Sequence, residues 1–99
     1  MTLFGWRIVR IWGRSMEPML RPDSFALFRP TRRVRQGDIV LVDHAEFGLI
    51  VKQVDRIAGG HFRLTGLSPL STTTDRMGPV PADRVLGRHV LTLSRPSTT

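Results

Sequence analysis

Residues 48–64 read GLIVKQVDRIAGGHFRL, and this stretch decides the fold. The run of β-branched and apolar residues from 48 to 57 predicts a strand. The pair Gly59-Gly60 is typical of a tight hairpin turn, so residues 61–64 are expected to return as an antiparallel strand. One charge, Lys52, lies in the middle of the first strand. The chain carries 15 lysines and arginines, and Lys52 is the only lysine among them.

The rest of the chain also favours short strands separated by turn signals. We expect strands at 7–12, 24–28, 38–42 and 85–93, loops at 29–36 and 66–79, and one helical turn at 81–85. Many short strands with little helix predict a mainly β fold, a small barrel or sandwich core. The 99 residues fit a single domain, which we place at residues 1–93, followed by a disordered tail at 94–99.

The composition argues against metal and thiol chemistry. The chain has no cysteine, which excludes a disulfide framework, a thiol nucleophile and a cysteine-based metal site. Its three histidines lack the close spacing of a zinc motif, so we expect no metal and no cofactor. We interpret His44, His61 and His89 as surface or strand-edge residues. Asp38 follows Gly37 and is interpreted as a turn residue at a strand entry.

The charge and hydropathy patterns limit the partners. The net charge is +7, but the arginines are scattered and no RNA-binding pattern of aromatic residues accompanies them, so we expect no nucleic-acid partner. The apolar runs are far shorter than the roughly 20 residues of a spanning helix. No signal peptide is recognisable at the N-terminus. We therefore expect a cytoplasmic protein with at most peripheral membrane association.

Lys52 and Ser15 are the candidate catalytic pair. A lysine buried in an apolar strand is costly when charged, so its pKa should fall, and a neutral amine is a general base. Because the chain has no cysteine, the nucleophile must be a hydroxyl. Ser15 is the best placed, since it follows a strand and opens a tight turn between Gly13 and Pro18. The alternative from the residues alone is a turn serine and a lysine that reaches solvent.

Four segments resemble the conserved boxes of the bacterial signal peptidase I family, in the same order. They are GRSMEPML (13–20), RQGDIVLV (35–42), VKQVDRIAGGHFRLTG (51–66) and GPVPADRVLGRHV (78–90). The resemblance implies a core fold similar to that of LexA, with Ser15 as nucleophile and Lys52 as base. It also implies an oxyanion held by the backbone of Ser15 and Gly13, a substrate cleft beside Met16 and Pro18, and no cofactor.

The segment between the last two boxes departs from the family pattern. The family commonly has Gly-Asp-Asn followed by Ser-x-Asp-Ser-Arg, whereas this chain has GLS at 66–68 and STTTDRMG at 71–78. The family uses a hydroxyl from this region to orient the lysine amine. Counting back from Gly78 places that hydroxyl on Ser71, and counting forward from Gly66 places it on Thr72.

The resemblance implies a serine endopeptidase that removes a leader or pro-segment from a protein substrate. Short soluble proteins similar to this chain include the maturation proteases of nickel-type superoxide dismutase. We expect the substrate to lie along a strand edge near residues 48–54. One alternative is a catalytically impaired binding module, which the altered segment favours. The other is a self-cleaving regulator similar to LexA, although residues 1–14 contain no Ala-Gly or Cys-Gly cleavage site.

Overall fold

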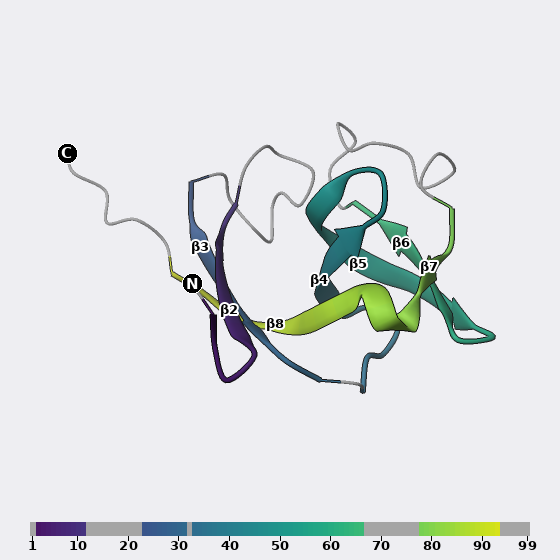
Figure 1. The fold of residues 1–99 in the computed structure, drawn as a ribbon, viewed down its shortest axis with the longest axis horizontal. Coiled ribbons are helices and arrows are strands. Elements are labelled where there is room, and N and C mark those ends of the chain that lie inside the picture. The colour runs from purple at the N-terminus through teal and green to yellow at the C-terminus, as the bar shows by residue number, and fades with distance from the viewer. Residues whose placement is uncertain (1, 12–22, 32, 67–77, 94–99) are drawn as a thin grey trace.

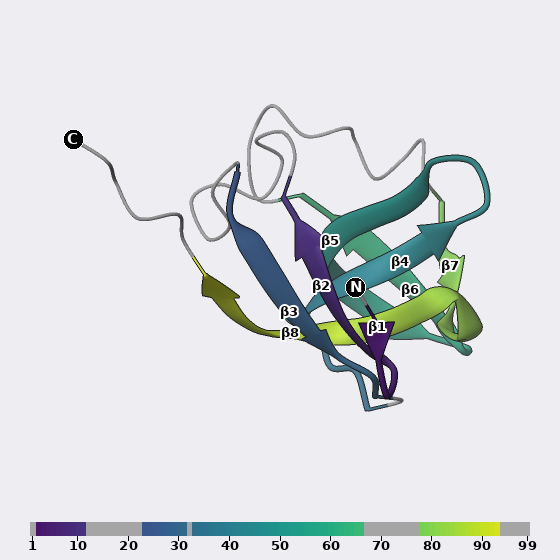
Figure 2. The same ribbon diagram turned by 60° about the vertical axis from the view of Figure 1, so that its left-hand side comes forward.

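Eight antiparallel strands form one sheet in the part of the chain that the structure describes (Figures 1 and 2). The structure is a computed structural model that describes residues 2–11, 23–31, 33–66 and 78–93. The strand order is β1-β2-β3-β8-β4-β5-β6-β7. The elements are β1 (Thr2–Leu3), β2 (Trp6–Arg10), β3 (Phe25–Arg29), β4 (Ile39–His44), β5 (Gly48–Ala58), β6 (His61–Thr65), β7 (Val80–Pro81), the 3-10 helix η1 (Ala82–Arg84) and β8 (Val85–Leu93).

The mainly β fold class predicted from the sequence is confirmed. The strand expected at 85–93 is β8, and the helical turn expected at 81–85 is η1. The β5–β6 hairpin turns at Gly59-Gly60 as predicted. Both glycines have positive φ angles, of 56° and 75°, which residues with a side chain rarely adopt.

Several boundaries differ from the prediction. The sequence did not indicate β1 or β7, because two residues are too short to show a period. The strand predicted at 24–28 lies at 25–29, since Arg29 still pairs with Arg88 of β8. The strand predicted at 7–12 runs from Trp6 to Arg10. Residues 12, 67–77 and 94–99, which include the predicted tail, lie outside the described residues.

Strand β4 is buried on both faces. Its residues Ile39, Val40, Leu41 and Val42 are consecutive and all at most 5% exposed. Ile39 and Leu41 belong to a core cluster with Ala26 and Phe28 of β3 and with Ile11. Val40 and Val42 face the other way. They belong to a second cluster, which contains Val54 of β5, Phe62 and Leu64 of β6, and Val80 of β7.

The sheet coils around β4 to form these two clusters. In Figure 1, β2 and β3 lie to the left of β4 and β5, while β6 and β7 lie to the right. Strand β8 passes beneath them and pairs with β3 through one half and with β4 through the other. Gly87 lies where β8 crosses from one partner to the other. A Cβ atom there would lie 2.8 Å from the carbonyl oxygen of Arg29, so only glycine fits.

Two leucines on the β4–β5 hairpin test the importance of this burial. Leu41 is 0% exposed and Leu49 is 58% exposed. We expect Leu41→Ala to lower the free energy of unfolding by about 2–5 kcal/mol, since it opens a cavity between packed strands. Leu49→Ala, the matched control, should change it by less than about 0.5 kcal/mol. Urea denaturation of both variants measures the difference, and equal effects would contradict the burial described here.

Candidate active site

Lys52 lies at the centre of β5 and is buried. It pairs with Val40 across the β4–β5 ladder and is 5% exposed. Because side chains alternate along a strand, Lys52 shares its face with Ile50 and Val54, which pack in or against the second core cluster. The lysine stem therefore lies among apolar side chains, as the sequence predicted.

Burial lowers the pKa of the Lys52 amine below its ordinary value, because the ammonium form loses hydration in apolar surroundings. Among the described residues, no hydrogen bond or ion pair reaches this amine to offset that loss. The neutral amine is accordingly more populated near neutral pH than in an exposed lysine. This is the electrostatic condition that a general base requires.

The turn before β4 fixes the register that places Lys52. The backbone N–H of Arg35 donates to Oδ2 of Asp38 at 2.8 Å, which confirms Asp38 as a turn residue. Gly37 N–H donates to the carbonyl oxygen of Val54, and Val54 N–H donates to that of Asp38, both at 2.8 Å. These bonds extend the β4–β5 ladder beyond its last strand pair, Ile39 and Gln53. A slip of one residue would turn Lys52 to the opposite face.

Among the described residues, one edge of β5 next to Lys52 has no strand paired to it. Residues 48–53 pair with β4, but β6 pairs with β5 only from Gln53 to Ala58. Within the described ranges, no strand pairs with the second edge of residues 48–52. An open edge presents backbone N–H and C=O groups to an extended peptide. This edge falls within the 48–54 range that the sequence analysis assigned to the substrate.

Two backbone hydrogen bonds join the described residues that flank the segment carrying Ser15. Ile11 N–H donates to the carbonyl oxygen of Ser24, and Asp23 N–H donates to that of Ile11, both at 2.8 Å. An ion pair between Arg10 and Asp23 reinforces the same place. Ile11 packs in the first core cluster with Ile39, whose strand partner Gln53 adjoins Lys52. Ile11, which precedes the segment, thus packs against β4, the strand that pairs with the lysine-bearing strand β5.

The other predicted site residues lie outside the described residues. These are Gly13, Ser15, Met16 and Pro18 in segment 12–22, and Ser71 and Thr72 in segment 67–77. The structure therefore places the candidate base, Lys52, and leaves the nucleophile and the amine-orienting hydroxyl as predictions from the sequence.

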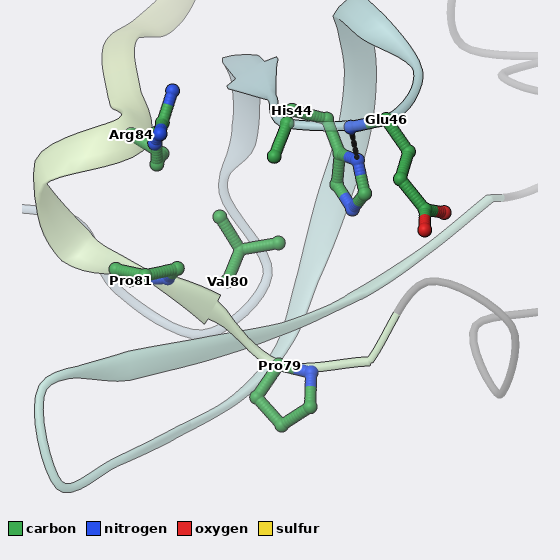
Figure 3. Close-up of a pocket in the computed structure, with 7 residues that line it drawn as sticks. His44, Glu46, Pro79, Val80, Pro81 and Arg84 are labelled. Carbon is green, nitrogen blue, oxygen red and sulfur yellow. Dashed lines mark hydrogen bonds between the residues drawn. The ribbon is translucent and has the colours of Figure 1, made fainter.

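A hollow of about 340 Å³ lies at the β4–β5 turn (Figure 3). Its lining comes from the end of β4 and the turn after it, from β7 and its flanking residue, and from η1: His44, Ala45, Glu46, Pro79, Val80, Pro81 and Arg84. Lys52 does not line it. Since His44 pairs with Gly48, the hollow lies at the Gly48 end of β5. No sequence pattern predicts this hollow, because residues of the β4–β5 hairpin, β7 and η1 meet there only through the coiling of the sheet.

The described histidines have structural contacts. Nδ1 of His44 accepts hydrogen bonds from the backbone N–H groups of Glu46 and Phe47, at 3.0 and 3.2 Å, and so closes the turn. His89 packs edge-on against Phe28, with ring centroids 5.9 Å apart. His89 is half-buried and pairs with Phe28 across the β3–β8 ladder. No group of three or more potential metal ligands occurs among the described residues.

A comparison with known protein families assigns the chain to one of them. Residues 5–88 match the Peptidase S24-like family, and because the match covers most of the chain, the chain belongs to that family. Membership indicates a serine-type peptidase or a self-cleaving protein at the level of the family, and a fold similar to those of LexA and signal peptidase. No curated protein matches the chain in a sequence comparison. Within the described residues, no helix has the length and apolar character to cross a membrane.

The lowered pKa of Lys52 has a consequence for stability. The pKa of a lysine in an unfolded chain is about 10.4. At pH values between the folded and the unfolded pKa of Lys52, the unfolded chain therefore binds more protons than the folded chain. The free energy of unfolding must therefore rise with pH across this window and level off above it. Lys52→Met removes the titration, and its stability advantage over the wild type should shrink as pH rises from about 7 to 11.

Urea unfolding of both proteins at a series of pH values measures this difference. The two proteins share every other titrating group, which makes the subtraction specific to Lys52. Parallel pH profiles would mean that the amine is hydrated and charged in the folded protein.

Proposed function

We propose that the chain is a serine endopeptidase in which Ser15 is the nucleophile and Lys52 is the general base. The observation that carries the proposal is the burial of the chain's only lysine on β5, beside a strand edge that no described strand covers. Arginine cannot be deprotonated in a protein, so a chain with 14 arginines would retain lysine where a neutral amine acts. Membership of the Peptidase S24-like family supports the class of reaction.

The proposed reaction needs no cofactor. The neutral Lys52 amine takes the proton of the Ser15 hydroxyl while the serine oxygen attacks the scissile carbonyl carbon. The backbone N–H groups of the Gly13–Ser15 corner hold the resulting oxyanion. The Lys52 ammonium gives its proton to the leaving amine, and the peptide bond breaks to leave an acyl-enzyme. Water, activated by the neutral amine, then releases the acid and restores Ser15.

We propose that the substrate is a protein with a leader or pro-segment that adds a strand to β5 at residues 48–52. Met16 and Pro18 would line the cleft, and the hydroxyl of Ser71 or Thr72 would orient the Lys52 amine. The sequence resemblance implies a preference for small side chains just before the cut, as in leader-peptide removal. We propose that the reaction takes place in the cytoplasm and that the chain is similar in role to the maturation proteases of nickel-type superoxide dismutase. The proposal includes no nucleic-acid partner.

A second candidate function is self-cleavage, which the family match also supports. Mass spectrometry of the purified chain distinguishes the two. A self-cleaving protein shortens itself at a rate that is independent of its concentration, whereas a peptidase acting on other proteins remains intact. An impaired binding module would neither shorten itself nor cut any peptide.

The dyad is tested with a library of proteome-derived peptides, in which new N-termini are identified by mass spectrometry. We expect Ser15→Ala and Lys52→Arg each to lower cleavage by at least about 10³-fold, because nucleophile and base act as a unit. Ser94→Ala is the matched serine control and should cleave at the wild-type rate. Full activity of Lys52→Arg would overturn the proposed base.

The strand edge is tested on a cleaved peptide by N-methylation of one backbone nitrogen at a time. If the substrate pairs with β5, N-methyl groups at alternate positions should lower kcat/KM, because only every second N–H points to the enzyme strand. The intervening positions are the internal control. Equal effects at all positions would mean that the peptide binds without adding a strand.

A further inference from the structure

The hollow at the β4–β5 turn lies on the same side of the sheet as Lys52. Residues paired across antiparallel strands point to one side, and residues two or four apart on a strand share that side. His44 is four residues from Val40, the strand partner of Lys52, and its own partner is Gly48. Val80 lines the hollow and belongs with Val40 to the second core cluster. The hollow and Lys52 therefore share one side of the sheet, four residues apart along β5.

Gly48 leaves the way to the hollow open along its own row. Apart from its two chain neighbours, a Cβ atom built at Gly48 would have no described heavy atom within 4 Å. A peptide strand added to β5 would place one residue opposite Lys52 and another, four residues along, opposite Gly48. This spacing is the same for a parallel and an antiparallel strand. The second side chain would point to the side of His44 and reach the hollow across Gly48.

The walls of the hollow are built largely from rings that are held in place. Nδ1 of His44 accepts hydrogen bonds from two backbone N–H groups of its own turn, and its ring centroid lies 4.9 Å from that of Phe47. Pro79 and Pro81 contribute two further rings, which fix the backbone φ angles there. In Figure 3 the ring of His44 lies opposite Pro79 and Val80. The walls therefore keep their shape without a ligand, which lowers the entropic cost of binding.

The hollow has the size and polarity for one aromatic side chain. Its volume of about 340 Å³ lies at the low end of the roughly 300–1,000 Å³ of ligand pockets. Val80 and the proline and imidazole rings offer apolar surfaces against which an aromatic ring packs. Glu46 and Arg84 are exposed and lie on opposite sides of the hollow in Figure 3. Their opposite charges favour neither an anionic nor a cationic side chain, whereas a guanidinium attracts the face of an aromatic ring.

We propose that this hollow is a specificity pocket that takes an aromatic side chain of the substrate, roughly four residues from the cut. The inference rests on the proposed function, because it requires a peptide strand on β5. Contacts at this distance from the reacting bond would select the substrate. They would also hold its scissile carbonyl in place for Ser15 and Lys52.

The position is tested by scanning a single Phe through a peptide that the wild type cleaves, with Gly at the other tested positions. We expect kcat/KM to rise at least about tenfold at one position, roughly four residues from the cut, because an aromatic side chain is buried there. Phe at the two adjacent positions should give no rise, since those side chains point to the opposite side of the sheet. Equal values at all positions would overturn the inference, and so would a rise for Leu as large as that for Phe.

A matched pair of variants assigns the preference to the hollow. Ala45 and Ala58 are both exposed, but only Ala45 lines the hollow. Ala45→Trp fills the hollow, so it should reduce the ratio of kcat/KM between the Phe and Gly peptides from at least about tenfold to about one. Ala58→Trp introduces the same bulk elsewhere on β5 and should keep the wild-type ratio. An unchanged ratio in Ala45→Trp would mean that the aromatic side chain binds elsewhere.

Binding measured without cleavage separates this inference from the proposed function. The Kd of Ser15→Ala for the Phe peptide, measured by calorimetry, should be at least about tenfold lower than for the Gly peptide. Cleavage without a preference for Phe would overturn the inference and leave the peptidase standing. A Phe preference in binding that Ala45→Trp removes, with no cleavage by the wild type, would overturn the peptidase and leave the hollow as the pocket of a peptide-binding module. Neither binding nor cleavage would overturn both.

Discussion

The burial of β4 on both faces is the constraint on which the rest of the structure depends. A strand with four consecutive buried residues must be covered from both sides, and a single sheet does this only by coiling around it. Strand β3 and Ile11 cover the face of Ile39 and Leu41, while β6 and β7 cover the face of Val40 and Val42. Away from β4, strand β3 packs against the core through Ala26 and Phe28, on one side only.

The same constraint explains the chemistry available to Lys52. Its strand partner, Val40, faces the second core cluster, so the lysine cannot avoid the desolvation that this cluster imposes. The Gly37–Asp38 turn holds the register through Val54, and the early end of β6 leaves the neighbouring edge of β5 unpaired within the described residues. A desolvated amine and an open strand edge therefore arise together from one arrangement of three strands. The proposed peptidase reaction requires both features.

The sequence predicted those parts of the fold that local patterns determine. The Gly59-Gly60 turn, the long β5 and the 85–93 strand each carry their own signal, and the apolar context of Lys52 predicted its burial. Features that depend on distant partners were not predictable: β7 is two residues long, and the hollow at the β4–β5 turn exists only because separate segments meet there. The role of Ser15 remains a prediction, since its segment lies outside the described residues. The structure places only Ile11, the residue that precedes this segment.

The position of β8 has a consequence for how the chain folds. Strands β3 and β4 follow each other in the sequence but do not pair, and β8 lies between them with ladders to both. Neither hydrophobic cluster is closed until residues 85–93 arrive, because Val85 packs against one and Leu86 against the other. The pairing of β3 with β8 closes a loop of about 60 residues, as between Arg29 and Arg88, and such pairing is entropically costly and slow to form. During synthesis on the ribosome, neither cluster can therefore be completed before β8 has been made. The two clusters then form together, in one cooperative step.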